Sequence, residues 1–197
     1  MNSKKGCIGV VAIGEVPTVA PRDISSHIQK HLGLPSVVLP PMQHPSYAYD
    51  QRRNQYNAAT ILKEFESMPF QNCNKVIGML NVDLFIPVFT YVLGEAQEGG
   101  KFALASMYRL RMDLNRSRPP MPQILERLAK VALHEIGHLF EVAHCMNEKC
   151  LMHYSSDLGD LDATNLSFCS YCSMYFSDSI RRHKVFGVEQ SFNSQKG

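Results

Sequence analysis

One pentapeptide, His134-Glu135-Ile136-Gly137-His138, indicates both a central helix of this chain and its chemistry. Histidines four residues apart lie one turn apart on the same face of an α-helix, where two imidazoles can hold one tetrahedral metal ion. Glu135 points about 100° around the helix and can take the proton of a metal-bound water without being a ligand itself. The stretch therefore predicts a zinc hydrolase site.

His144 is the candidate for a third ligand. It is in the wrong phase to share a helix face with His138, so the helix must end near Phe140 and the chain must turn back. Three protein ligands with one position left for water are typical of catalytic zinc. The pentapeptide also occurs by chance on helices that bind no metal, but a third histidine and adjacent thiols favour a metal site.

Four of the six cysteines form a second candidate set: Cys145, Cys150, Cys169 and Cys172. Two short knuckles that pair across a longer loop are typical of structural zinc. The alternatives are disulfides or free thiols, but the lack of a convincing secretion signal favours metal in a reducing, cytoplasmic compartment. We therefore expect two zinc ions, one catalytic and one structural. Cys7 and Cys73 are expected to be ordinary buried or half-buried thiols.

The stretch from His134 to Cys172 resembles archaemetzincin, a metzincin-like family of zinc proteases whose histidine motif continues into a four-cysteine zinc site. Gly94-Glu95-Ala96 and the segment 106–110 also resemble its edge-strand and preceding-strand motifs, so the resemblance covers roughly residues 5–185. It implies an α/β (α+β) zincin with a twisted, mostly parallel five-stranded sheet and an antiparallel edge strand. An active-site helix would lie beneath the sheet, beside a small Cys-rich zinc subdomain.

The resemblance also implies roles for single residues. Glu135 becomes the general base. Met152 becomes the Met-turn methionine beneath the catalytic zinc, although ten methionines in the chain make ordinary core filling the alternative. Tyr154 resembles a turn tyrosine that approaches the metal, and is a weaker candidate for substrate binding. The implied zinc ligands are His134, His138 and His144 in the catalytic site and Cys145, Cys150, Cys169 and Cys172 in the second site.

Glu141 departs from the family pattern, which has Gly three residues after the second histidine, where the helix ends. Gly is favoured there because it adopts positive φ without a Cβ penalty, whereas Glu in that conformation costs about 1–2 kcal/mol. We expect Glu141 to adopt it nonetheless, because zinc binding is worth roughly 10 kcal/mol or more. In the alternative the helix runs on and His144 misses the metal, which is then held weakly by His134 and His138 with either water or His153.

Composition suits one compact domain. The chain has 197 residues, 45% hydrophobic residues and a net charge of +2, so neither a nucleic-acid nor a membrane partner is expected. No apolar run approaches the ~20 residues of a membrane-spanning helix. We expect one metzincin-like catalytic domain over residues 1–187, including a zinc-bound C-terminal subdomain at 144–183, and a disordered tail at 188–197.

Strand and helix signals alternate along the chain. Continuous apolar runs predict buried strands, and capped amphipathic segments predict helices. The expected strands are residues 7–13, 36–39, 75–81, 89–93 and 102–108. By the resemblance, the strand around residues 90–94 would be the exposed edge of the sheet. The expected helices are residues 23–31, 57–68, 124–140 and 171–183. The segment 109–122, with four Arg, is expected to be a solvated loop, with an anion site as the alternative.

Together these features predict a zinc-dependent peptide-bond hydrolase, endo- or aminopeptidase, that binds a peptide or protein substrate along the sheet edge by strand addition. One alternative is a catalytically silent zinc-binding scaffold that binds a partner through the same edge, which Glu141 favours and Glu135 opposes. Another is a zinc-ribbon-like nucleic-acid binder, which needs a basic patch. Residues 145–172 oppose it, with one Lys and no Arg against three Asp and one Glu.

Overall fold

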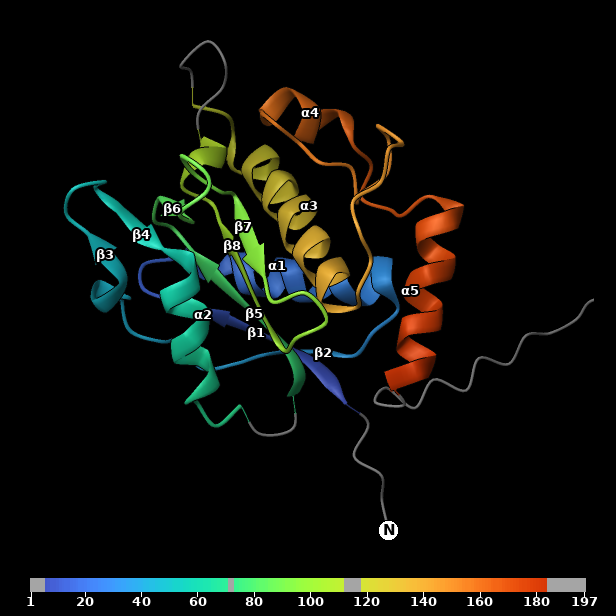
Figure 1. Cartoon of the computed structure of the whole chain (residues 1–197), viewed down its shortest axis with the longest axis horizontal. Coiled ribbons are helices and arrows are strands. Elements are labelled where there is room, and N and C mark those ends of the chain that lie inside the picture. The colour runs from blue at the N-terminus through green and yellow to red at the C-terminus, as the bar shows by residue number, and fades with distance from the viewer. Residues whose placement is uncertain (1–5, 71–72, 112–117, 184–197) are drawn as a thin grey trace, which may run out of the picture.

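A computed structural model describes residues 6–70, 73–111 and 118–183, and the tail predicted at 188–197 lies outside them. Its centre is a five-stranded sheet in the order β2-β1-β5-β8-β7 (Figure 1). All neighbours are parallel except β7, which is antiparallel to β8. The predicted fold class and sheet are thus confirmed. The strands are β1 (Cys7–Ala12), β2 (Ser36–Val38), β5 (Cys73–Leu80), β7 (Gly94–Ala96) and β8 (Phe102–Ser106).

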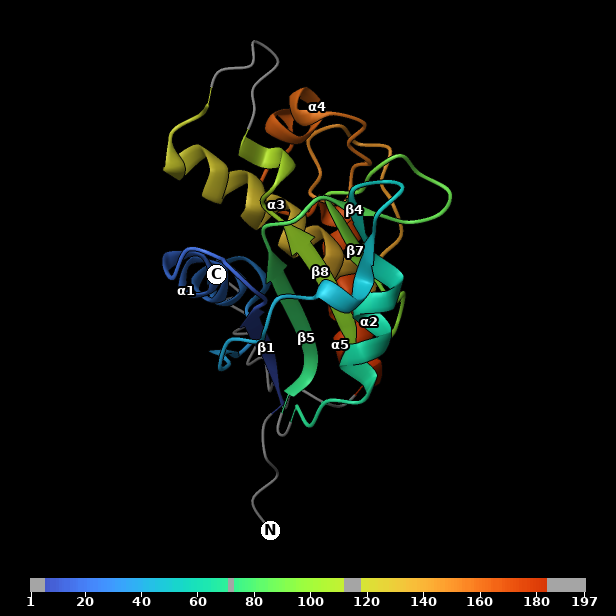
Figure 2. The same ribbon diagram turned by 90° about the vertical axis from the view of Figure 1, so that its left-hand side faces the viewer.

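Helices cover both faces of this sheet (Figure 2). Alternate strand residues point to opposite faces, so Ile8 and Ile77 pack in one hydrophobic cluster with α1 and α3, whereas Val11 and Val76 pack in another with α2. This two-sided burial explains why the strands are continuous apolar runs. The helices are α1 (Val19–His27), continued by a π-helical turn (Ile28–Leu32), α2 (Ala58–Glu66), α3 (Met121–Leu139), α4 (Leu158–Ala163) and α5 (Ser170–His183). None of the helices in the described ranges is long and apolar enough to cross a membrane.

The strand expected at 89–93 and the sheet edge expected around 90–94 are placed too early, because the edge strand is β7, at Gly94–Ala96. β7 coincides with the segment Gly94-Glu95-Ala96 that resembles the edge-strand motif. The Phe89 N–H donates to the carbonyl of Ile86 (3.1 Å) and closes a turn. The Phe89 carbonyl accepts a hydrogen bond from the Arg53 guanidinium (2.9 Å). Backbone groups satisfied in this way are not available to pair with β8, so the sheet edge starts further along the chain.

Two helices begin earlier than expected. α1 begins at Val19 rather than Asp23, and α3 begins at Met121 rather than at residue 124. Pro21 and Pro122 lie in the respective first turns, where proline is tolerated because those N–H groups have no helical acceptor. The sequence pattern places the first start too late because it takes Asp23 as the N-cap, and the second because the apolar periodicity begins at Ile124.

Short elements had no clear sequence signal. β3 (Tyr49–Asp50), β4 (Gln55–Asn57) and β6 (Leu84–Phe85) form a three-stranded sheet beside the main one. Two or three residues are too few to show a period. The expected solvated loop at 109–122 is wrong at its start, because residues 109–111 form a 3-10 turn held by an ion pair to Asp83. That ion pair also opposes an anion site at Arg109, and residues 112–117 lie outside the described part of the chain.

The C-terminal segment is fastened to α3 through two buried cations. Arg127 donates to both carboxylate oxygens of Asp162 (2.7 and 2.5 Å). Lys130 donates to the carbonyls of Leu161 and Asp162 (3.1 and 3.0 Å). Lys130 thus satisfies carbonyls at the C-terminal end of α4, and Arg127 pairs with a carboxylate there. The residues that follow the active-site helix are therefore held against that same helix.

Candidate metal and catalytic site

His134 and His138 lie one turn apart on α3. The Nδ1 of His134 is 2.8 Å from the carbonyl oxygen of Leu151, and the Nδ1 of His138 is 3.0 Å from that of Val142. A carbonyl only accepts hydrogen bonds, so each Nδ1 carries a proton and each Nε2 presents a lone pair. The two Nε2 atoms are 3.0 Å apart. Two acceptors at this distance repel each other unless a cation binds both.

The active-site helix ends in a Schellman motif whose left-handed residue is Glu141, with a φ of 62°. The Val142 N–H donates to the carbonyl of Gly137 (3.1 Å), and the Glu141 N–H donates to the carbonyl of His138 (3.0 Å). The expected positive φ at Glu141 is confirmed, and the alternative of a longer helix is wrong.

A buried lysine from β5, which the sequence pattern did not single out, binds the end of this helix. The Lys75 Nζ donates to the carbonyls of Leu139 (2.7 Å) and Gly100 (2.6 Å). Burial lowers the pKa of Lys75, and the negative charge of Glu141 acts in the opposite direction. One cation therefore joins the C-terminal end of α3 to the turn between β7 and β8.

The bend at Glu141 brings His144 back to the helix. The ligand atoms of His134, His138 and His144 lie within 4.8 Å of one another, and His153 is not part of the set. Burial is the largest cause that lowers the pKa of these three imidazoles, that of His134 to about 3. Neutral imidazoles with converging lone pairs are the state that binds zinc. The donor set fits one zinc ion.

Glu135 is not in the ligand set but lies beside the edge strand, buried at 9% exposure. A Cβ atom on Gly94 would lie 2.6 Å from the Glu135 Cγ, so glycine at this position of β7 leaves room for the acid. Burial, and then the charge of Glu95, raise the pKa of Glu135 well above its usual value. A glycine inside a strand is a signal of such a close approach, but the sequence pattern alone did not connect Gly94 to Glu135.

A cleft of about 420 Å³ opens over the three histidines and Glu135. Ile86 and residues 89–96 line it from the sheet side, and residues 153–156 line it from the C-terminal segment. Tyr154 lies in the cleft, half exposed, with its ring centroid 5.4 Å from that of His144. Its place suits the predicted contact with substrate.

Met152 is fully buried beneath the histidines. A Cβ atom on Gly137 would lie 2.5 Å from the Met152 Sδ, so the glycine of the pentapeptide lets the thioether pack directly on α3. The methionine therefore supports the helix turn that carries His134 and His138. The Met-turn role that the resemblance implied for Met152 stays a prediction.

The four cysteines converge behind the cleft. The Sγ atoms of Cys145, Cys150, Cys169 and Cys172 lie within 4.8 Å of one another, and all are free thiols. The Cys169 N–H donates to the Cys150 Sγ (3.2 Å). A hydrogen bond from the Cys172 amide is the largest cause that lowers the pKa of Cys169 to about 7. A backbone donor aimed at Cys169 favours its thiolate, whereas burial raises the pKa of Cys150 and of Cys172. Four sulfur ligands that lie this close together fit one closed, tetrahedral zinc ion.

Cys7 and Cys73 lie outside both ligand sets. They face each other across β1 and β5 with their Sγ atoms 3.6 Å apart. Cys73 is buried and Cys7 is half-buried, as expected for ordinary thiols.

Known proteins are similar to this chain in sequence and in fold. The sequence profile of Peptidase family M54 matches residues 21–178. The chain belongs to Peptidase family M54. The archaemetzincin of Pyrococcus horikoshii is 34% identical over 140 residues, which cover 71% of this chain and 74% of that protein. The archaemetzincin of Methanocaldococcus jannaschii is 35% identical over 142 residues, covering 72% and 76%.

Solved structures agree with this assignment to family M54. The crystal structure of archaemetzincin from Methanopyrus kandleri has 28% sequence identity and a TM-score of 0.81, covering 92% of this chain and 99% of that chain. That of a zinc-dependent peptidase from Methanocorpusculum labreanum has 25% identity and a TM-score of 0.78, covering 86% and 99%. The resemblance to archaemetzincin is confirmed, and this member of M54 is a zinc metallopeptidase.

Proposed function

We propose that the chain hydrolyses peptide bonds with a water molecule that Glu135 deprotonates at the three-histidine site. The observation that carries this proposal is the convergence of three imidazole ligand atoms beneath a cleft in which Glu135 is a lining residue and not a ligand. The chemistry supplied when zinc is bound is Lewis acidity, which makes a neighbouring water easier to deprotonate. The ligands are His134, His138 and His144, and the general base is Glu135.

The peptide binds along the free edge of β7 in this proposal. The Ser106 N–H donates to the Leu93 carbonyl, and the Gln97 N–H donates to the Phe102 carbonyl. In an antiparallel pair only every second residue bonds to the partner strand, so Glu95 also faces β8 whereas Gly94 and Ala96 turn their N–H and C=O groups outward. Those groups can pair with an extended peptide and lay it over the histidines. Tyr154, on the other wall, binds the substrate.

The second zinc ion is structural in this proposal, held by Cys145, Cys150, Cys169 and Cys172. His144 immediately precedes Cys145, so metal at the cysteine set also holds the third histidine in place. We infer a single metzincin-like catalytic domain over 1–187, with the segment 144–183 as its zinc-bound subdomain. Four thiols positioned for metal support a reducing, cytoplasmic compartment.

The test is Glu135→Gln in zinc-loaded protein, with Glu64→Gln, an exposed acid on α2, as the matched control. General-base catalysis contributes about 10²–10⁴-fold, so cleavage of a peptide library should fall by that factor while zinc content stays at the wild-type level. The control should retain wild-type cleavage. Cleavage that survives Glu135→Gln, or loss of zinc from this variant, would refute the assigned role.

A further inference from the structure

One wall of the cleft is a segment that presents apolar side chains. Residues 86–93, here called the rim, line the cleft from Ile86 and from Phe89 through Leu93. At the turn of the rim, Phe89 lines the cleft and is 46% exposed, and Val88, which lies next to it in the chain but outside the cleft lining, is 83% exposed. Large apolar side chains exposed beside a binding cleft indicate an interaction site rather than a core.

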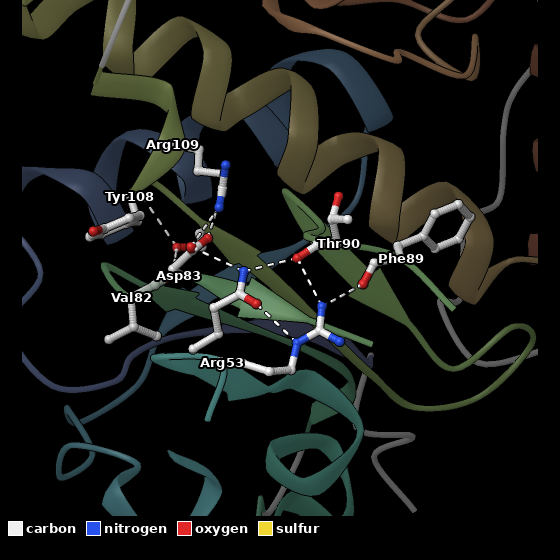
Figure 3. A network of polar contacts seen from close by, with 9 residues as sticks. Arg53, Val82, Asp83, Phe89, Thr90, Tyr108 and Arg109 are labelled. Carbon is white, nitrogen blue, oxygen red and sulfur yellow. Dashed lines mark hydrogen bonds and ion pairs between the residues drawn. The ribbon is translucent and has the colours of Figure 1, made fainter. Parts of the chain in front are cut away.

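A guanidinium holds the rim from behind (Figure 3). The Arg53 Nη2 donates to the carbonyls of Phe89 (2.9 Å) and Thr90 (3.1 Å). The Thr90 carbonyl also accepts from the Gln55 Nε2 (2.9 Å). The Arg53 side chain stacks over the Phe85 ring, with its Cζ 4.2 Å from the centroid. Two consecutive carbonyls of the rim are therefore held by Arg53, which lies between β3 and β4, and by Gln55, the first residue of β4.

A carboxylate extends this network to the end of the main sheet. Asp83 accepts from both the Nε and the Nη2 of Arg109 (2.5 and 2.7 Å) and from the Gln55 Nε2 (3.1 Å). The Arg109 Cζ also lies 4.0 Å from the centroid of Tyr91, a rim residue. Charge-assisted, bidentate bonds of this kind have well-defined geometry. The network, here called the brace, consists of Arg53, Gln55, Asp83 and Arg109.

The brace separates two ways of contacting a peptide. Arg53 of the brace donates hydrogen bonds to the carbonyls of Phe89 and Thr90, so these carbonyls are not available for strand addition. The free backbone edge lies at Gly94 and Ala96, next along the chain. The rim therefore offers a peptide its side chains, whereas β7 offers its backbone N–H and C=O groups.

We propose that the rim is a pre-organised apolar subsite that selects a large apolar side chain of the peptide substrate, and that the brace residues are positioning residues for it. The inference rests on the proposed peptidase function. It commits to a substrate side chain as the occupant because the rim is continuous with the cleft over the three histidines. A subsite that is held in place before binding loses less conformational entropy on binding.

The first experiment measures selectivity by competition. Peptides that differ only by Phe or Ser at one position are cleaved as a mixture, and the position is scanned along both sides of the scissile bond. The ratio of the two kcat/KM values is independent of the fraction of active enzyme, so partial unfolding or zinc loss does not change it. At one position the wild-type chain should prefer Phe by about 10-fold or more, the scale of apolar pockets.

Variants of the rim should reduce that ratio. Val88→Ser and Phe89→Ser should each lower it several-fold, whereas Val37→Ser, an exposed valine on β2 at the opposite edge of the sheet, should leave it unchanged. Wild-type protein with no apolar preference at any position, or rim variants that keep the wild-type preference, would overturn the proposal.

Brace variants separate positioning from stability. Arg53→Met removes both bonds to the rim carbonyls, and Arg52→Met is the matched control, since its side chain is exposed and has no bond to the rim. Arg53→Met should lower the Phe-to-Ser ratio, mainly through a higher KM for the Phe peptide. A variant that lowers only the unfolding temperature, with the ratio unchanged, would refute the positioning role.

Binding without cleavage distinguishes this proposal from the proposed function. The chain contains no Trp, so a peptide with one Trp in place of Phe is the only Trp fluorophore in a mixture with zinc-loaded Glu135→Gln protein. Tight peptide binding that Phe89→Ser weakens would support the rim as a subsite. If the wild-type protein then cleaved no peptide, only the proposed hydrolysis would be rejected. Peptide binding that Phe89→Ser and Val88→Ser leave unchanged would reject the rim, whatever the cleavage.

Discussion

Replacing Glu141 tests how the bend after the active-site helix is stabilised. Its φ of 62° puts a Cβ in the left-handed region, at a cost of about 1–2 kcal/mol. Glycine removes that cost but loses about 0.5–1 kcal/mol more conformational entropy on folding. The ion pair of Glu141 with Arg182 (3.3 Å) has both side chains about half exposed, so it contributes about 0–1 kcal/mol.

Two variants separate these contributions. Glu141→Ala keeps the Cβ and removes the ion pair, so it should be destabilised by about 0–1 kcal/mol. Glu141→Gly removes both, so relative to Glu141→Ala it should be more stable by about 0–1.5 kcal/mol. For a 197-residue chain, 1 kcal/mol shifts the unfolding temperature by about 2–4 °C. Thermal unfolding of the zinc-loaded proteins should therefore place Glu141→Gly above Glu141→Ala by up to about 6 °C.

Zinc content and cleavage complete the Glu141 test. The Schellman hydrogen bonds at 141 and 142 come from backbone N–H groups, so both variants should keep His144 in place, with zinc content and peptide cleavage like those of the wild type. The assignment of strain to this residue would be refuted if Glu141→Gly were less stable than Glu141→Ala. It would also be refuted if Glu141→Gly alone bound zinc more tightly.

Three further variants or measurements test the site. Gly94→Ala puts a Cβ 2.6 Å from the Glu135 Cγ, so peptide cleavage should fall at least about tenfold with zinc content retained; unchanged cleavage would contradict the close approach. Metal analysis should find two zinc ions per chain, and Cys150→Ser should lose the one that resists chelator longer; one zinc in the wild type would refute two sites. Lys75→Met leaves buried carbonyls unsatisfied, Leu139 among them, at about 1–3 kcal/mol, so its unfolding temperature should fall, and an unchanged temperature would contradict the capping role.

Spacing along the chain was enough to predict both ligand sets. The four-residue interval of His134 and His138 indicates a shared helix face whatever surrounds it, because the helical period is local. The cysteine knuckles also predict shared ligand sites from spacing alone, because two cysteines only a few residues apart in the chain stay close together in space. Buried parallel strands were also predictable, because burial on both faces requires continuous apolar runs.

The sheet edge shows what a local pattern leaves open. The segment 89–93 and Gly94–Ala96 are adjacent; apolar content favoured the first as a strand, whereas the resemblance to the edge-strand motif favoured the second. The structure selects the second because Arg53, 36 residues before Phe89, binds carbonyls that a strand would need. Competition for a backbone acceptor between distant residues has no signature in the sequence near that acceptor.

The sequence alone thus determined the candidate metal ligands and the end of the active-site helix near Phe140. Only the tertiary structure decided that Glu141 takes the left-handed conformation, that Gly94 makes room for Glu135, and that Lys75 caps the helix end. The physical reason is that period and spacing are properties of a single segment. Strain, close approach and buried capping depend on contacts among α3, β5 and β7, which only the folded chain brings together.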